Sequence, residues 1–274
     1  MPKIVAGEIE LYYEEYGEGA PLVLIPGFGT GLWIWFKQVP AFSREFRTLV
    51  FDPRGISRSD APNAPITIRT IADDLAALLY ALRIESAHIL GASFGGFVAQ
   101  EFALAYPAMT RSLTLCCTSF GGPGHVPPSL ETLQALASTK GLNTQQRVRE
   151  NLLLAFSPAY VERNHEEVEK VICLRAENFV PEHAYLHQLQ AAMAFNTEER
   201  VSQISAPTLV LTGDADIIVP EENSRNLAAR IPDARLVTIK GGSHTFFIEQ
   251  ADEFNTAVIE FIKEIEKASC ATQR

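Results

Sequence analysis

The sequence has little cysteine and lacks any long hydrophobic run. Four cysteines occur in 274 residues, and their spacing matches no metal-ligand pattern: Cys116, Cys117, Cys173 and Cys270. We expect reduced thiols that act as small apolar fillers, which argues against a disulfide framework, a metal site and a thiol nucleophile. No charged-then-apolar leader precedes Glu8, and no apolar stretch approaches the length of a membrane span. These absences predict a cytoplasmic protein without a membrane partner.

Positive charge is also in short supply. Lysine and arginine number 23 against 33 aspartates and glutamates, which gives a formal net charge of -10 and a pI near 5.1. Such a chain repels the phosphates of nucleic acids and is disfavoured at anionic membrane surfaces. Hydrophobic residues make up 47% of the chain, enough for a large soluble core. We therefore expect a small-molecule substrate and no nucleic-acid partner, while the oligomeric state stays open.

Buried strands and amphipathic helices alternate along most of the chain. A half-exposed strand at residues 8–16 is expected to pair with residues near Ile4 through a turn at Gly7. Helices are predicted where apolar residues recur every three or four positions, at residues 68–82, 94–106, 221–231 and 249–265. Buried strands are predicted between them, at residues 22–25, 48–51, 87–90, 112–116, 209–211 and 236–239. This order favours an α/β fold with a mainly parallel sheet covered on both faces.

A glycine-rich pentapeptide, Gly91-Ala92-Ser93-Phe94-Gly95, stands between a predicted strand and a predicted helix. Glycines at both ends allow strained dihedral angles and close packing of the helix against the strands. A serine at such a bend projects from the sheet and is placed to act as a nucleophile. The pentapeptide alone is equally compatible with a glycine-rich loop, so the interpretation depends on finding a base and an acid elsewhere.

A carboxylate and an imidazole follow in workable order. Asp214 and Asp216 come directly after the buried strand at 209–211, at a strand end where open α/β sheets carry working groups. His244 lies on a loop after the strand at 236–239. A serine hydroxyl needs a base within hydrogen-bond reach, and that base needs a third group to orient it. The set Ser93, aspartate and His244 is therefore a candidate catalytic triad.

These segments resemble those of the α/β-hydrolase superfamily, in particular its small bacterial esterase, enol-lactonase, haloperoxidase-like and C–C hydrolase branches. The resemblance runs over nearly the whole length. The order serine, aspartate, histidine is that of the family, and its pattern favours Asp216 over Asp214 because Pro220 follows. The other matching segments are Pro26-Gly27-Phe28-Gly29, Asp52-Pro53-Arg54-Gly55 through Ser59-Asp60, Gly213-Asp214-Ala215-Asp216 and Gly242-Ser243-His244.

The resemblance implies an α/β-hydrolase fold with a mostly parallel eight-stranded sheet, helices on both faces and a helical cap inserted after strand 6. The interval from Gly121 to Ser205 fits such a cap, because it has helical patterns punctuated by prolines and no clear strand. We thus expect two core segments, at residues 1–122 and 206–274, around a cap at residues 123–205.

The family's geometry also implies an oxyanion hole made by the backbone N–H groups of Phe28 and Phe94. Trp33 and Trp35, near the first of these, either line a substrate pocket or pack a helix. His88, in a predicted buried strand, is expected to be a hydrogen-bonded structural residue. No cofactor or metal is implied.

Hydrolysis of a small or medium carboxylic ester or lactone through an acyl-enzyme is the leading functional hypothesis. Two alternatives stay open. One is hydrolysis of a C–C bond in a ring-cleavage diketone, although those enzymes usually carry a tryptophan a few residues after the histidine, where this chain has Ile248. The other is a ligand receptor or sensor that uses the same fold.

Overall fold

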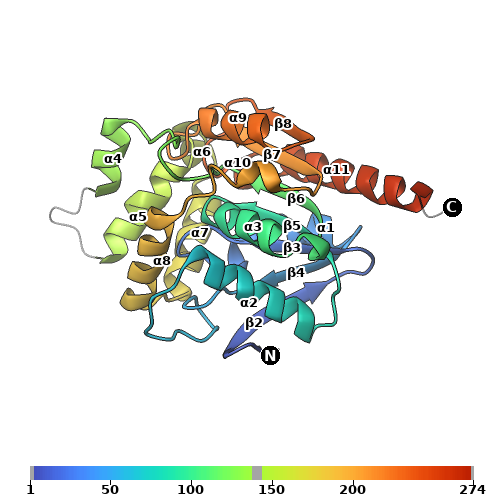
Figure 1. Ribbon diagram of the computed structural model, residues 1–274. Helices are drawn as coiled ribbons and strands as arrows, with labels where there is room; N and C mark the ends of the chain where they lie inside the picture. Colours follow the sequence, from blue (N-terminus) through green and yellow to red (C-terminus); the bar gives the residue numbers. More distant parts are fainter. Residues whose placement is uncertain (1–2, 138–143, 273–274) are drawn as a thin grey trace.

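An eight-stranded sheet forms the centre of the computed structural model, which describes residues 3–137 and 144–272 (Figure 1). The strand order is β1–β2–β4–β3–β5–β6–β7–β8. β2 pairs antiparallel with β1 and with β4, and all the later neighbours are parallel. The strands are β1 (Lys3–Ala6), β2 (Ile9–Tyr16), β3 (Pro21–Ile25), β4 (Arg47–Phe51), β5 (Ala87–Ala92), β6 (Thr110–Cys116), β7 (Thr208–Gly213) and β8 (Ala234–Ile239).

Burial along the strands follows from their place in the sheet. Each strand from β3 to β7 has at most one residue that is not buried, since both faces of a parallel sheet are covered by helices. β8 differs from the expected buried strand, because only Ile239 of its six residues is buried. The reason is that β8 is an edge strand, which has a neighbour on one side alone.

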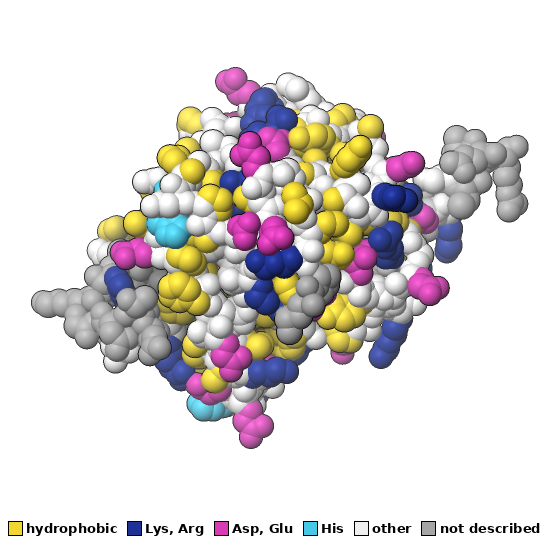
Figure 2. Space-filling view, turned by 90° about the horizontal axis from the view of Figure 1, so that it is seen from below, with side chains coloured by type: hydrophobic (Ala, Val, Ile, Leu, Met, Phe, Trp, Pro, Cys, Tyr) yellow, Lys and Arg dark blue, Asp and Glu magenta, His cyan; other side chains and the backbone are white. Residues whose placement is uncertain are grey.

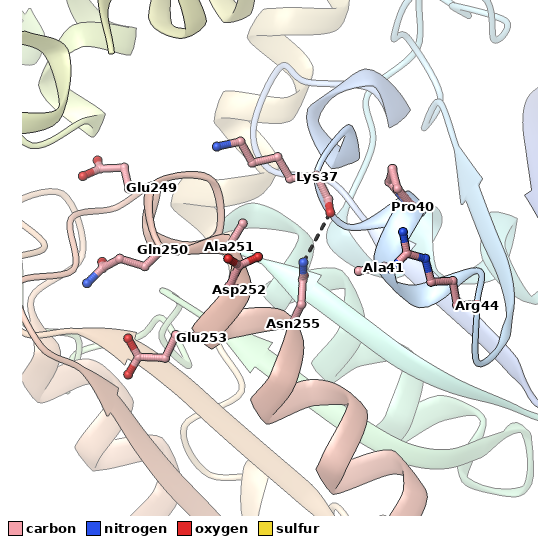
Figure 3. A pocket seen from close by; sticks show the side chains of 10 residues that line it. All are labelled: Lys37, Pro40, Ala41, Arg44, Glu249, Gln250, Ala251, Asp252, Glu253 and Asn255. Atoms are coloured by element: carbon pink, nitrogen blue, oxygen red, sulfur yellow. Dashed lines mark hydrogen bonds between the residues drawn. The ribbon is translucent and has the colours of Figure 1, made fainter. Parts of the chain in front are cut away.

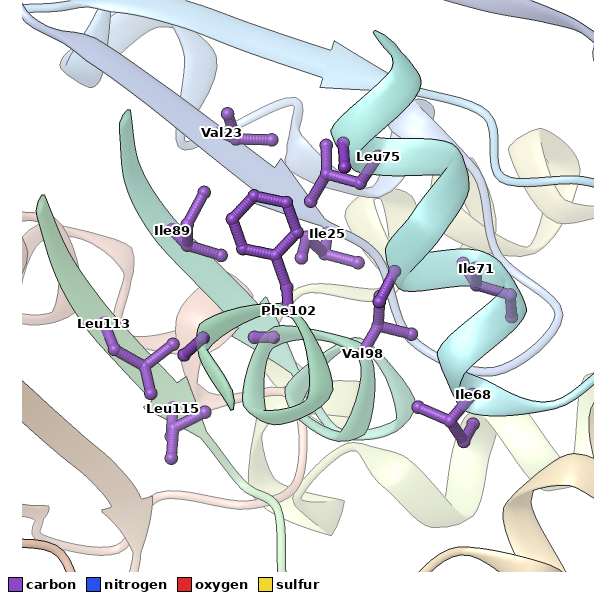
Figure 4. Close-up of a cluster of buried hydrophobic side chains, with 14 of the residues drawn as sticks. Val23, Ile25, Ile68, Ile71, Leu75, Ile89, Val98, Phe102, Leu113 and Leu115 are labelled. Carbon is purple, nitrogen blue, oxygen red and sulfur yellow. The ribbon is translucent and has the colours of Figure 1, made fainter. Parts of the chain in front are cut away.

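Two hydrophobic clusters lie on opposite faces of the sheet, because successive side chains of a strand point to opposite sides. Val23 and Ile25 of β3 face the cluster that holds α2 (Ile68–Ala81), α3 (Phe94–Ala105) and α9 (Glu221–Arg230). Figure 4 shows α2 and α3 packed over that face. Leu22 and Leu24 face the second cluster, which includes the short helices η1 (Leu32–Trp35) and α1 (Val39–Phe42) and the carboxyl-terminal helices.

The carboxyl-terminal helix departs from its predicted bounds. The sequence predicts one helix at residues 249–265, whereas the structure has α10 (Phe246–Glu249) followed by α11 (Ala251–Thr272). Gln250, with φ -120° and ψ 46°, interrupts the helical backbone between them. None of the helices in the described ranges has the length and apolar character that crossing a bilayer requires.

Between β6 and β7 the described chain forms several helices and adds no strand to the sheet, as predicted. It contains α4 (Leu130–Ala137), α5 (Thr144–Ala155), α6 (Pro158–Arg163), α7 (His165–Glu177), α8 (Glu182–Ala194) and the short η3 (Val201–Gln203). We call residues 130–194 the helical segment. It accepts hydrogen bonds from backbone N–H groups of the loops that follow β3, β4 and β8. Gly29 donates to the side-chain Oε1 of Gln188, Ser57 to the Phe179 carbonyl and Thr245 to the Ala155 carbonyl. All three loops stand at the carboxyl ends of their strands, so the helical segment lies against that edge of the sheet.

Charged side chains of both signs are mixed on the molecular face in Figure 2. Lysines and arginines there stand among aspartates and glutamates. Among the side chains described on that face, positive charge forms no continuous patch of the kind that a phosphate backbone requires.

Candidate active site

The carboxyl ends of β5, β6, β7 and β8 meet at one edge of the sheet, because these four strands are parallel neighbours. Ser93 follows β5, Cys117 follows β6, Asp216 follows β7 and His244 follows β8. Residues that are distant in the sequence are thereby brought to adjacent loops.

Ser93 occupies a strained backbone bend. Its φ of 54° and ψ of -117° lie in a region that non-glycine residues rarely adopt. The bend turns β5 directly into α3, and its flanking glycines allow the close contacts this requires. A side chain at Gly95 would collide with the backbone oxygen of Ile25, and one at Gly91 would collide with that of Gly95. Packing therefore requires glycine at positions 91 and 95, independently of any role of Ser93.

A hydrogen bond joins Asp216 to His244. The distance from His244 Nδ1 to Asp216 Oδ2 is 2.8 Å, and the carboxylate is completely buried. The other oxygen, Oδ1, accepts the backbone N–H groups of Ile218 and Val219 at 2.8 and 2.9 Å. Asp214 is exposed and binds the backbone N–H of Gly241 instead. The structure thus brings Asp216, and not Asp214, to the imidazole.

Cys117 connects the serine bend with this pair. Its sulfur lies within 4.8 Å of both a carboxylate oxygen of Asp216 and a ring nitrogen of His244. The Ser93 N–H donates to the carbonyl of Cys116 at 2.8 Å, so Ser93 is tied to the backbone beside Cys117. Burial and the nearby Asp216 charge raise the pKa of the Cys117 thiol well above its usual value. The thiol is therefore neutral, which argues against a role as a thiolate nucleophile.

The other cysteines agree only in part with the expected buried fillers. Cys116 is a buried free thiol, like Cys117. Cys173 is also free but exposed, because it lies on the solvent side of α7. That part of the expectation is wrong. The side chain of Cys270 lies outside the described residues.

The loop after β3 lies against the serine bend. Gly27 and Thr30 close a turn, in which the Thr30 N–H donates to the Gly27 carbonyl at 3.2 Å. A Cβ added to Gly27 would stand 3.7 Å from the Cβ of Ser93. Phe28, within the turn, and Phe94, at the first position of α3, have ring centroids 6.0 Å apart. The N–H of Phe94 has no acceptor within its own helix, as at every helix start.

Trp33 and Trp35 belong to the second hydrophobic cluster. Trp35 has no exposed surface, and its ring centroid is 5.3 Å from that of Phe247. Trp33 is 7% exposed. The sequence left two interpretations open for these tryptophans, pocket lining and packing. The position of Trp35 fits packing.

Two residues of the helical segment reach the loop after β3, and sequence reasoning missed both. Gln188 Oε1 accepts the N–H of Gly29 at 3.0 Å. Arg175 Nη2 stands 3.3 Å from the position of a Cβ added to Gly29. Burial lowers the pKa of the Arg175 guanidinium. Its Nη1 donates to the Asn178 carbonyl at 3.2 Å, and among the described residues no carboxylate forms an ion pair with it. A basic residue at a helix end was the only sequence signal for Arg175, and Gln188 had none.

A separate pocket of about 710 Å³ lies between α1 and the start of α11 (Figure 3). Lys37 and Arg44 line one side of it, and Asp252 and Glu253 line the other. Neither Ser93, Asp216 nor His244 belongs to its lining. The candidate active site and this pocket are therefore different features.

Comparison with known proteins agrees with this architecture. The sequence profile of the alpha/beta hydrolase fold family matches residues 20–251. The chain belongs to this family. A RutD protein of Azorhizobium caulinodans, named as a carbamate hydrolase, is 31% identical over 267 residues, which cover 97% of this chain and 100% of the relative.

Two further relatives have other named activities. A 2-hydroxy-6-oxononadienedioate/2-hydroxy-6-oxononatrienedioate hydrolase of Pseudomonas putida is 30% identical, over 93% of this chain and 92% of the relative. The crystal structure of the enol-lactonase from Burkholderia xenovorans has a TM-score of 0.84 and 28% identity, over 96% of this chain and 100% of that structure. The relatives are hydrolases, and this α/β-hydrolase is an enzyme of the same kind.

Proposed function

We propose that this α/β-hydrolase is a serine hydrolase that cleaves a small or medium carboxylic ester or lactone through an acyl-enzyme. Ser93 is the nucleophile, His244 the general base and Asp216 the group that orients the base. The observation that carries the proposal is the 2.8 Å hydrogen bond between His244 Nδ1 and the buried Asp216 carboxylate, beside a serine on a strained bend.

The direction of this hydrogen bond determines which ring nitrogen is basic. An ionised carboxylate only accepts hydrogen bonds, so Nδ1 of His244 carries the proton. In the neutral ring Nε2 then has the free lone pair. Two backbone N–H donors on the other oxygen of Asp216 fix that carboxylate in place. His244 is thus held in the tautomer that a general base requires.

The reaction proceeds in two stages. As Ser93 Oγ attacks the carbonyl carbon, His244 Nε2 takes the hydroxyl proton and later gives it to the leaving oxygen. The bond to the leaving group breaks and leaves an ester of Ser93, which water hydrolyses with His244 again as base. The negative oxygen of each tetrahedral intermediate is stabilised by the N–H groups of Phe28 and Phe94, the first on the turn beside Ser93 and the second at the start of α3.

We assign residues 123–205 the role of a cap over this site. Support comes from the contacts of the helical segment with three loops at the carboxyl edge of the sheet. A cap supplies pocket walls and excludes water from the reacting groups.

Arg175 indicates that the preferred substrate carries a negative group. A guanidinium that is partly buried without a carboxylate is unfavourable unless a ligand supplies the opposite charge. Arg175 lies beside Gly29 of the loop that contacts Ser93, so a substrate bound at Ser93 brings its anionic end within reach. A bidentate pair with a carboxylate fits this residue type.

Hydrolysis of a C–C bond in a diketone acid is the second candidate. The Arg175 position favours it, and the name of the P. putida relative denotes a dicarboxylate substrate. Ile248 at the place of the usual tryptophan argues against it. The likeness to a protein named as a carbamate hydrolase adds a third carbonyl substrate that the same serine chemistry serves.

A substrate panel separates these possibilities. p-Nitrophenyl esters, lactones, carbamates and a ring-cleavage diketone acid are tested with the wild type and with Ser93→Ala, each ester and lactone with and without a distal carboxylate. We expect multiple turnover of an ester or lactone, and a loss of at least about a thousandfold in Ser93→Ala with folding intact. A single slow turnover with large ligand stabilisation would instead indicate a sensor.

The role of Arg175 is tested on the same panel with Arg175→Met. The preference for carboxylate-bearing substrates should disappear, while turnover of neutral esters changes little. Arg163→Met is the matched control, because Arg163 is an exposed residue of α6. An unchanged preference in Arg175→Met would refute the anion-binding role without affecting the triad.

A further inference from the structure

Gln188 is a buried polar side chain that links the helical segment to the loop after β3. It is 1% exposed, and its Oε1 accepts the backbone N–H of Gly29 at 3.0 Å, although the two residues stand 159 positions apart. A buried amide is unfavourable unless it is hydrogen-bonded. This bond is therefore a specific connection between α8 and the loop, and its loss would leave a buried donor without a partner.

The geometry of the turn explains why Gly29 needs an outside acceptor. Thr30 closes the turn through both its N–H and its Oγ1, which donate to the Gly27 carbonyl at 3.2 and 2.9 Å. Gly29 has φ +61°, the left-handed conformation that a type II turn requires at its third residue. The N–H of that residue has no partner within the turn. Gln188 supplies one.

The bond to Gln188 fixes the peptide plane between Phe28 and Gly29. Rotation of this plane is coupled to the backbone of Phe28, whose N–H is one of the two proposed oxyanion donors. Tyr185, one turn earlier on α8, packs its ring against that of Phe28 with a centroid distance of 4.8 Å and an interplanar angle of 71°. Residues three apart share a helix face, so α8 holds Phe28 and Gly29 at two points.

We propose that Gln188 is a positioning residue for the oxyanion hole. Through the Gly29 amide, it holds the turn so that the Phe28 N–H points to the oxygen on which negative charge develops. The helical segment thereby completes the catalytic site in addition to covering it. This inference rests on the proposed serine hydrolase function, because the Phe28 N–H has no task without a tetrahedral intermediate.

The expected effect is on the transition state. The oxyanion exists in the tetrahedral intermediate and not in the bound substrate, so a misaligned donor lowers kcat more than it raises KM. Complete loss of one donor lowers the rate about 100- to 1000-fold. A turn that has lost its anchor but not the donor should lose about 10- to 100-fold in kcat.

The test compares three variants with the wild type in p-nitrophenyl acetate hydrolysis. Gln188→Met keeps the length of the side chain and removes the acceptor. Gln188→Glu keeps an acceptor oxygen at Gly29, and the Arg175 guanidinium, which also lies beside Gly29, is expected to offset the new charge. Gln190→Met is the matched control, because Gln190 is an exposed residue of the same helix. Inhibition by a trifluoromethyl ketone, which forms an oxyanion adduct with the serine, is measured for each.

We expect Gln188→Met to lower kcat about 10- to 100-fold and to weaken the ketone by the same factor. Its KM and the acidic limb of its pH profile should stay unchanged, because the bond between His244 and Asp216 is untouched. Gln188→Glu should recover most of the loss, and Gln190→Met should match the wild type. If Gln188→Met fails to fold, Gln188→Asn, which is too short to reach Gly29, replaces it.

Two results would overturn the inference, and neither is confused with failure of the proposed function. One is a wild-type kcat and ketone affinity in a folded Gln188→Met or Gln188→Asn. The other is an increase in KM with an unchanged kcat. In both cases Ser93→Ala would still be inactive, whereas a Ser93→Ala variant with undiminished activity would refute the serine mechanism itself.

Discussion

Asp214 and Asp216 stand two positions apart and bind different partners. Asp216 is buried against His244, and Asp214 is exposed and closes a turn with Gly241. Removing charge from the first disturbs the imidazole, whereas removing it from the second disturbs a loop.

We therefore expect Asp216→Asn to lower kcat/KM severely, by a smaller factor than His244→Ala. An amide at 216 can donate to Nδ1, which favours the wrong tautomer of His244. Asp214→Asn should keep near-wild-type kcat/KM. Steady-state kinetics with the best ester of the panel checks both. Near-normal rates in Asp216→Asn beside a collapse in Asp214→Asn would contradict this assignment.

His88 makes the stability of the fold depend on pH. It is buried in β5, where Nδ1 contacts Ser112 Oγ at 2.8 Å and Nε2 contacts Glu266 Oε1 at 3.0 Å. Burial lowers the pKa of His88 below its usual 6.5, although the Glu266 charge partly opposes the shift. As pH falls from 6.5 toward the lowered pKa, the unfolded chain binds more protons than the folded one, so stability decreases.

The prediction is that His88→Gln flattens this part of the pH profile of stability. Glutamine retains hydrogen-bonding atoms but does not titrate. The free energy of unfolding in urea, measured from pH 7.5 to 5, should fall less steeply in the variant than in the wild type. His165→Gln serves as a control, because the His165 side chain is 71% exposed. Parallel profiles for His88→Gln and the wild type would show that His88 does not contribute.

Single residues were predictable from the sequence when a motif marked them. The glycines around Ser93, and the positions of Asp216 and His244 after predicted strands, indicated a candidate site that the fold then brings to one edge of the sheet. Arg175 and Gln188 carry no such mark. Their importance comes from contacts with Gly29 that exist only once the helical segment folds onto the sheet.

At the scale of elements, α3 determines how closely the serine bend approaches the loop after β3. Gly95 allows this close approach, because the backbone oxygens of Ile25 and Pro26 lie where a Cβ atom would otherwise stand. Helix propensity alone favours alanine over glycine here by about 1 kcal/mol. The collision with backbone atoms opposes that gain and displaces the helix start.

Gly95→Ala should therefore destabilise the protein despite the better helix former, and it should lower kcat because the Phe94 N–H moves with the helix start. Thermal unfolding and ester kinetics measure the two effects. Ala105→Gly, at the carboxyl end of the same helix, provides the comparison: it should cost no more than about 1 kcal/mol of stability and leave kcat unchanged. A more stable Gly95→Ala variant would contradict the packing argument.

Elements were predicted well where burial and periodicity agreed. The bounds of α2, α3 and α9 differ from the predicted ranges by a single residue at one end. The break at Gln250 was not predictable, because Glu249 and Ala251 continue an amphipathic pattern across it. At the break, Gln250 Nε2 donates to the Lys240 carbonyl at 2.9 Å, a contact with the loop after β8 that exists only in the folded chain.

At the scale of the whole molecule, Glu249 ties the histidine loop to the helical segment. Its carboxylate accepts the Ser157 N–H at 2.8 Å, the Ser157 hydroxyl at 2.6 Å and the Thr245 hydroxyl at 3.1 Å, and it also binds the Ser243 hydroxyl. Ser243 and Thr245 flank His244, and Ser157 caps α6. The position of the base and that of the helical segment are thus coupled through one side chain, a relation between distant residues that no local pattern encodes.

Glu249→Gln should loosen both the loop that carries His244 and the attachment of the helical segment to it. The amide nitrogen replaces an acceptor with a donor, so the Ser157 N–H or a hydroxyl loses its partner at about 1–3 kcal/mol. We expect a lower free energy of unfolding and a lower kcat, because the loop around His244 is less firmly held. Urea unfolding and ester kinetics measure the two quantities.

Glu253→Gln, at an exposed position of α11, controls for the loss of charge. If Glu249→Gln lost stability but kept kcat, the loop that carries the base would be held by the core alone, and the coupling between the helical segment and His244 would be excluded.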